Sequence, residues 1–66
     1  MSDVNQFIIF CLESYKSASG LTGEQAFADF EAYDVFSYLS DGFDVLHTQG
    51  REYIIKDIQE YIACRK

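Results

Sequence analysis

Apolar residues recur at three- and four-residue spacing in four stretches of the chain, a pattern that predicts helices with one buried side. The first helix is predicted over residues 4–19, and its apolar positions are Phe7, Ile8, Cys11, Leu12 and Tyr15. The last is predicted over about 50–64, and its apolar positions are Ile54, Ile55, Ile58, Tyr61 and Ile62. The pattern predicts an all-α fold, a compact bundle of about four short helices in a single domain over residues 1–66.

Two further helices are predicted in the middle of the chain. The second runs to about Tyr33, with apolar positions at Ala26, Phe27, Phe30 and Tyr33. The third follows Asp34, with apolar positions at Val35, Phe36, Tyr38, Leu39, Phe43, Val45 and Leu46. Gly42 lies inside this last pattern, where it either divides the segment into two short helices or lets another backbone approach closely. The pattern is compatible with both.

Polar residues and glycines mark the predicted helix ends. Asp3 is a candidate N-cap for the first helix, with Gln6 as its capping-box partner, and Gly20 is a plausible stop. Thr22 and Gln25 form a clearer capping box ahead of the second helix. Asp34 is the candidate N-cap of the third.

The charge distribution narrows the possible partners. The chain has 5 basic and 11 acidic residues, a net charge of −6, and no Lys or Arg lies between Lys16 and Arg51. That interval carries six acidic residues, Glu24, Asp29, Glu31, Asp34, Asp41 and Asp44. Such a surface repels nucleic acids and anionic membranes, so we expect neither as a partner. It either serves solubility alone or meets a basic protein surface.

The chemistry-bearing residues are few. The segment "MSDVNQ" has no basic region typical of a signal peptide, and "FIIFCL" is far shorter than the roughly 20 residues of a membrane span. We therefore expect a cytoplasmic protein in which Cys11 and Cys64 are reduced thiols. Two cysteines and one histidine are a poor metal set, and no spacing brings them together as a catalytic group. We expect no metal, no cofactor and no enzymatic activity.

The segment "FIIFCL" carries more apolar residues than one buried stripe requires. Ile9 and Phe10 point away from the stripe of the first helix, so one of them is expected on the surface as part of an interface. Alternatively, this helix is central and contacted on most sides.

The segment "LHTQG" contains His47, the only histidine. In the structural interpretation, Thr48 caps the last helix and the His47 ring meets a free carbonyl at the end of the preceding helix. Gly50 then allows close backbone packing or itself closes the third helix. In the alternative, His47, Thr48 and Arg51 form a polar cluster that contacts a partner.

The motif around this segment carries a resemblance to a known family. Twelve residues match its pattern: Phe43, Asp44, Val45, Leu46, His47, Thr48, Gly50, Tyr53, Ile54, Ile55, Asp57 and Ile58. Together with "FIIFCLESYKSASGLTGEQAF" and "FEAYDVFSYL", they make nearly the whole chain resemble the short bacterial proteins called domain of unknown function 3791. Members of this family are often encoded beside a larger protein that resembles an ADP-ribosyltransferase toxin.

The resemblance implies a non-enzymatic protein-binding module, an antitoxin-like inhibitor of an ADP-ribosyltransferase-type toxin. The alternative is a homo-oligomeric helical regulatory module without a toxin partner. The candidate partner-binding residues are Ile9, Phe10, Asp41, Asp44, His47, Thr48 and Arg51.

Overall fold

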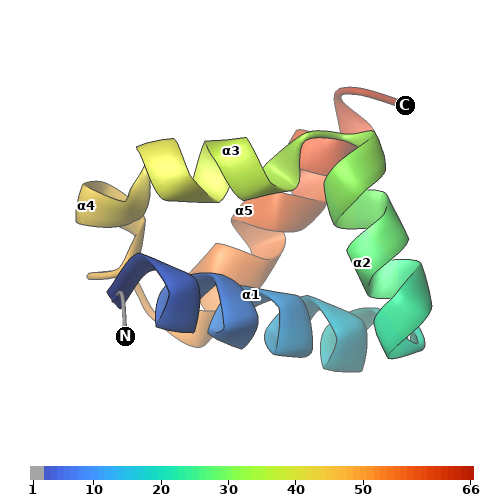
Figure 1. Ribbon diagram of the computed structural model, residues 1–66, viewed down its shortest axis with the longest axis horizontal. Coiled ribbons are helices and arrows are strands. Elements are labelled where there is room, and N and C mark those ends of the chain that lie inside the picture. Colours follow the sequence, from blue (N-terminus) through green and yellow to red (C-terminus); the bar gives the residue numbers. More distant parts are fainter. Residues whose placement is uncertain (1–2) are drawn as a thin grey trace.

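A computed structural model describes residues 3–66 and shows five helices joined by short turns (Figure 1). They are α1 (Asp3–Ser19), α2 (Gly23–Ala32), α3 (Val35–Asp41), α4 (Phe43–Leu46) and α5 (Arg51–Ala63). The predicted all-α bundle is confirmed. Gly42 divides the predicted third helix, so that α4 is a separate helix of 4 residues.

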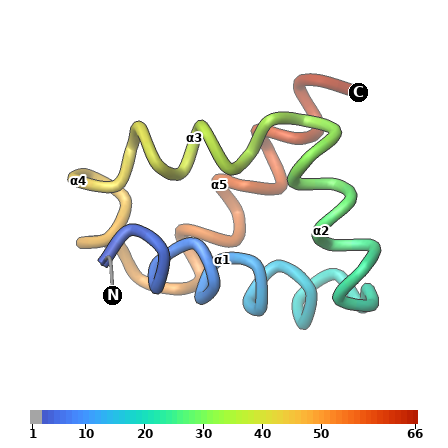
Figure 2. Tube along the Cα trace, in the orientation of Figure 1, coloured from blue at the N-terminus to red at the C-terminus, as the bar shows by residue number. Residues whose placement is uncertain are grey.

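Four helices form a frame that the fifth closes from one side. In Figure 1, α1 lies along the lower edge, α2 rises from its end and α3 runs back above α1. The short α4 turns the chain at the far end, and α5 crosses behind the frame in contact with α1 and α3. The tube in Figure 2 shows the N-terminal end beside α4 and the C-terminal end beside the α2–α3 corner.

The core lies where these helices meet. Its buried apolar residues are Phe7, Cys11, Tyr15, Ala26, Phe30, Val35, Leu39, Leu46, Ile54, Ile58 and Ile62. The predicted stripes of the first and last helices are therefore confirmed. Phe27 and Val45, assigned to the apolar stripes of the middle helices, are 46% and 67% exposed. Phe27 contacts the Phe36 ring near the surface. In the single turn of α4, Leu46 is buried and Phe43 packs partly buried against the core, whereas Val45 faces solvent.

Two of the predicted helix ends are confirmed in atomic detail. The Thr22 hydroxyl accepts from the Gln25 backbone N–H at 3.1 Å, and Gln25 Oε1 accepts from the Thr22 N–H at 3.0 Å. This reciprocal capping box satisfies amides that the helix itself leaves free. Gly20 has a φ of +66°, and the Leu21 N–H donates to the Lys16 carbonyl at 3.0 Å. This left-handed closure ends α1.

Of the two predicted aspartate caps, Asp3 is wrong, and Asp34 is confirmed in position but not as a side-chain cap. Asp3 lies inside the first turn of α1, where its negative charge interacts favourably with the positive end of the helix dipole. Asp34 does hold the N-cap position of α3, but its side chain makes no capping hydrogen bond. Its φ of +58° is left-handed, whereas a capping side chain acts from extended backbone. The tight reversal between α2 and α3 demands this conformation, which aspartate tolerates better than most residues.

The predicted capping of the last helix by Thr48 is also wrong. The N-cap of α5 is Gly50, two residues later. The Thr48 hydroxyl instead donates to the Val45 carbonyl at 2.7 Å, at the end of α4, and the Thr48 backbone N–H donates to the same carbonyl at 3.4 Å. The predicted close packing at Gly50 is absent, since a Cβ there would have no neighbour within 4 Å. The close approach occurs at Gly42, where a Cβ would lie 3.0 Å from Leu46 Cδ1.

A stack of side chains fastens the end of α5 to α3. The rings of Tyr38 and Tyr61 lie parallel with centroids 4.0 Å apart, and the Arg65 guanidinium covers Tyr61 at 3.5 Å. Tyr38 also donates a hydrogen bond to the Asp57 carboxylate. This group of contacts orders the C-terminal turn of the protein.

Candidate binding groove

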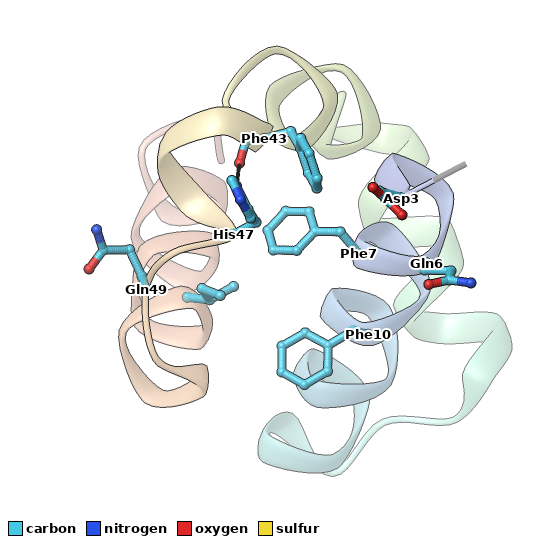
Figure 3. Close-up of a pocket in the computed structure, with 8 residues that line it drawn as sticks. Asp3, Gln6, Phe7, Phe10, Phe43, His47 and Gln49 are labelled. Atoms are coloured by element: carbon cyan, nitrogen blue, oxygen red, sulfur yellow. Dashed lines mark hydrogen bonds between the residues drawn. The ribbon is translucent and has the colours of Figure 1, made fainter. Parts of the chain in front are cut away.

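A groove of about 490 Å³ opens between the first turns of α1 and the α4–α5 connection (Figure 3). Its lining residues come from three separate parts of the chain: Asp3, Gln6, Phe7, Phe10, Phe43, His47, Gln49 and Ile54. The volume lies in the range of roughly 300–1,000 Å³ that is typical of ligand pockets.

Helix α1 supplies one wall of the groove. Asp3, Gln6, Phe7 and Phe10 are spaced by three or four residues and so lie on one side of a helix. Phe7 is buried at the base, whereas Phe10 is 43% exposed at the rim. Figure 3 shows both rings directed into the space between α1 and α5.

The opposite wall is built by α4 and the residue that ends it. The Phe43 ring meets the Phe7 ring edge to face, with centroids 5.4 Å apart and an angle of 73°. On its other side, Phe43 stacks with the His47 ring at 4.5 Å and 14°. Ile54 of α5 is 2% exposed and contributes an apolar surface beneath them.

The His47 ring is held by a hydrogen bond of its own chain. Its Nδ1 lies 2.6 Å from the Phe43 carbonyl oxygen, as predicted for a ring at a helix end (Figure 3). A carbonyl can only accept, so Nδ1 carries the proton. In the neutral ring Nε2 is then an acceptor. The exposed His47 therefore offers an aromatic face and an acceptor nitrogen.

The structure brings together only part of the predicted partner-binding set. Phe10 and His47 line the groove. The remaining five lie outside it, all of them exposed: Ile9, Asp41, Asp44, Thr48 and Arg51. Arg51 donates from Nε to the hydroxyl of Ser14 at 3.2 Å, while Thr48 bonds Val45. His47 and Thr48 thus bond carbonyls of α4, whereas Arg51 bonds α1, so the three side chains do not form one hydrogen-bonded cluster.

Sequence reasoning missed several residues of the groove. Asp3, Gln6 and Phe7 had a usable signal, since they share a helix face with Phe10. Phe43, Gln49 and Ile54 had none, because their position opposite α1 depends on how α4 and α5 pack. The groove is a product of tertiary structure on that side.

Burial raises the pKa values of three side chains that lie outside the groove. Desolvation raises the pKa of the Cys11 thiol to about 12. Burial, aided by hydrogen bonds to Asp29 and Asp57, raises the pKa values of Tyr15 and Tyr38 to about 12. These groups stay neutral at physiological pH and act as structural elements.

Two features are absent from residues 3–66. No group of three or more His, Cys, Asp or Glu side chains in this part of the chain is arranged to hold a metal ion. None of its helices combines the length and apolar character needed to cross a membrane.

Comparison with known proteins gives the class to which this chain belongs. The family model described as "Protein of unknown function (DUF3791)" matches residues 6–65. The chain therefore belongs to the DUF3791 family, as its "LHTQG" motif and flanking helices indicated. No curated protein and no solved structure matches the chain.

Proposed function

We propose that this protein is a non-enzymatic, cytoplasmic protein-binding module, an antitoxin-like inhibitor of a bacterial ADP-ribosyltransferase-type toxin. The observation that carries the binding role is the exposure of large apolar side chains on α1 and α4. Ile9 and Phe10 on α1 are 59% and 43% exposed, and Val45 on α4 is 67% exposed.

Such exposure favours association with another protein. Each Å² of apolar surface removed from water contributes about 25 cal/mol, and exposed apolar patches mark interaction sites. Phenylalanine and other aromatic residues are enriched at such interfaces. The groove beside Phe10 gives this surface a concave element that a partner side chain can fill.

Acidic residues at both ends of α3 favour a basic partner. Asp41 and Asp44 are exposed where α3 ends and α4 begins, and Glu31 and Asp34 are exposed at the α2–α3 corner. No Lys or Arg lies between Ser17 and Gly50 to neutralise them locally. A basic groove that binds the NAD pyrophosphate of a transferase is a complementary surface. An acidic protein seated there excludes the substrate.

The proposed type of partner rests on the genomic context that the family resemblance implies. Members of this family are often encoded beside a protein that resembles an ADP-ribosyltransferase toxin, an arrangement typical of a toxin and its inhibitor. The chemistry in this proposal belongs to the partner, and the small protein acts by occupying its surface.

Co-expression with the product of the adjacent gene tests the proposal. The protein is expected to restore growth of cells that make the toxin and to co-purify with it at low salt. Because the contact is proposed to be electrostatic, rising salt should weaken it. The double variant Asp41→Asn/Asp44→Asn should lose affinity. The matched variant Glu13→Gln/Glu60→Gln neutralises two exposed carboxylates outside the Ser17–Gly50 interval and should retain it. Absence of a complex at low salt contradicts the proposal.

A second candidate function rests on the same exposed side chains. Ile9 and Val45 are both more than half exposed, which also suits a homo-oligomeric regulatory module. Light scattering of the purified protein separates the two. A stable dimer that ignores the toxin favours self-association, whereas a monomer that binds the toxin favours the inhibitor.

A further inference from the structure

We propose that the groove between α1 and the α4–α5 connection receives an arginine side chain of the partner protein. The guanidinium lies against the aromatic rings that line the groove, Phe10 and His47 among them, and the buried side chains of Phe7 and Ile54 form its apolar base. This assignment rests on the proposed protein-binding function for the source of the arginine. The chemistry of the groove itself is tested separately below.

The first argument is the aromatic lining. Three phenylalanines and one histidine line a single groove, and Phe10 at its rim offers a ring face to solvent. A guanidinium is planar, weakly hydrated and stacks on aromatic faces, whereas the lysine ammonium is compact and strongly hydrated. A cation over a ring gains electrostatic attraction from the ring quadrupole. The lining therefore suits arginine better than lysine.

The second argument is that polar groups of the groove are negatively charged or accept hydrogen bonds. Asp3 supplies a carboxylate, and the fixed tautomer of His47 leaves Nε2 as an acceptor in the neutral ring. No Lys or Arg is among the lining residues to compete with these two acceptors. These groups complement the N–H donors of a guanidinium.

The helix dipoles do not reverse this preference. Helices α1 and α5 both begin at this end of the molecule, where their partial positive charges would repel a cation. Each has an acidic residue in its first turn, Asp3 in α1 and Glu52 in α5, that offsets this charge. Asp44 does the same for the short α4. These carboxylates offset the partial positive charges of the helix ends near the groove, in keeping with the net negative charge of the chain.

A small-molecule titration tests the groove without any toxin. The ¹⁵N-labelled protein is titrated with N-acetyl-L-arginine N-methylamide and, in parallel, with the lysine and norleucine analogues. The arginine probe is expected to shift the amide signals of Phe7, Phe10, Phe43 and His47 and to bind more tightly than both analogues. Norleucine carries the apolar stem alone, so it measures the contribution of the charge.

Variants then separate the two proposed interactions. Phe10→Leu keeps an apolar side chain but removes the ring, and Asp3→Asn removes the charge. Each is expected to weaken the arginine probe about 2- to 5-fold. The matched controls are Phe27→Leu, an equally exposed phenylalanine on α2, and Glu60→Gln, an exposed carboxylate far along α5. Both controls should leave binding unchanged.

The possible outcomes distinguish this inference from the proposed function. Equal binding of arginine and norleucine, or shifts that miss the groove, overturns the arginine site even if a toxin complex forms. Selective arginine binding that depends on Phe10 and Asp3 supports the site. That result stands even if the adjacent gene product forms no complex, in which case only the choice of toxin as partner fails.

Discussion

Arg51 at the start of α5 donates from Nε to the hydroxyl of Ser14, a residue of α1 that is 4% exposed, across 3.2 Å. The side chain that sequence reasoning placed at a partner interface therefore joins two helices of its own fold. The bond satisfies the only buried polar side chain among residues 3–66.

Removing this hydrogen bond should lower the free energy of unfolding. Its effect on partner binding should be smaller. Arg51→Ala is expected to reduce the free energy of unfolding by about 1 kcal/mol, the usual net contribution of a hydrogen bond. Urea denaturation measures this change. A double-mutant cycle with Ser14→Ala should show coupling between the two sites, because they share one interaction. Additive effects of the two substitutions contradict the assignment.

Stability should fall at alkaline pH because burial holds three protons in place. The pKa of Cys11 is raised from 9.0 to about 12, and those of Tyr15 and Tyr38 from 10.0 to about 12. A group whose pKa is raised on folding contributes stability that is complete below its unfolded pKa and is lost above it. The free energy of unfolding should therefore decline from about pH 9 for the thiol and about pH 10 for the phenols, down to a lower value near pH 12.

Tyr38→Phe isolates one of these groups. Removing its hydrogen bond to Asp57 should cost about 1 kcal/mol at neutral pH. The variant should then lose less stability than the parent between pH 10 and 12. Tyr53→Phe is the control, because Tyr53 is 56% exposed and no side-chain hydrogen bond of it is found in residues 3–66. Urea midpoints at several pH values provide the measurement, and parallel curves for parent and Tyr38→Phe contradict the prediction.

The two free thiols should differ in reactivity. Cys64 is exposed, whereas Cys11 is fully buried. Only the thiolate reacts, and burial disfavours it at Cys11. A disulfide reagent such as DTNB should modify Cys64 at once and Cys11 about 10³-fold or more slowly, through opening of the fold. Cys64→Ser and Cys11→Ser give each rate separately. Rapid labelling of Cys11 in the native protein shows that the core opens readily.

Substitution of Gly42 should destabilise the protein, although its φ of −94° is open to any residue. A Cβ there would lie 3.0 Å from Leu46 Cδ1 and 3.2 Å from the Tyr38 carbonyl oxygen. Gly42→Ala is expected to destabilise the protein by about 1 kcal/mol, because the short α4 must shift away from α3. Gly23→Ala is the control, since its Cβ would meet no atom within 4 Å and should stabilise by about 0.5 kcal/mol. Thermal unfolding compares the two, and equal effects contradict the prediction.

Sequence reasoning predicted what depends on neighbours along the chain. The apolar stripes of the first and last helices, the Thr22–Gln25 capping box and the stop at Gly20 follow from local spacing and conformation, and the structure confirms them. The carbonyl partner of His47 is local for the same reason, four residues away on the same helix end.

Features that depend on how helices cross were not available from the pattern. Thr48 had the right side chain for a cap, but the path from α4 to α5 moved the cap to Gly50. Phe27 fitted a helical stripe, yet the crossing of α2 and α3 leaves it near the surface. The groove itself requires Phe7 and Phe43 to meet, which only the packed molecule shows. The partner-binding residues predicted from sequence therefore include only two that line the groove, Phe10 and His47.

The parallel rings of Tyr38 and Tyr61 also give the protein an optical signature. The chain has five tyrosines and no tryptophan, so its near-ultraviolet spectrum comes mainly from phenols. Two rings 4.0 Å apart couple electronically, and the Arg65 guanidinium adds a charge against one of them. Near-ultraviolet circular dichroism therefore monitors the docking of α5 on α3 directly, without any added label.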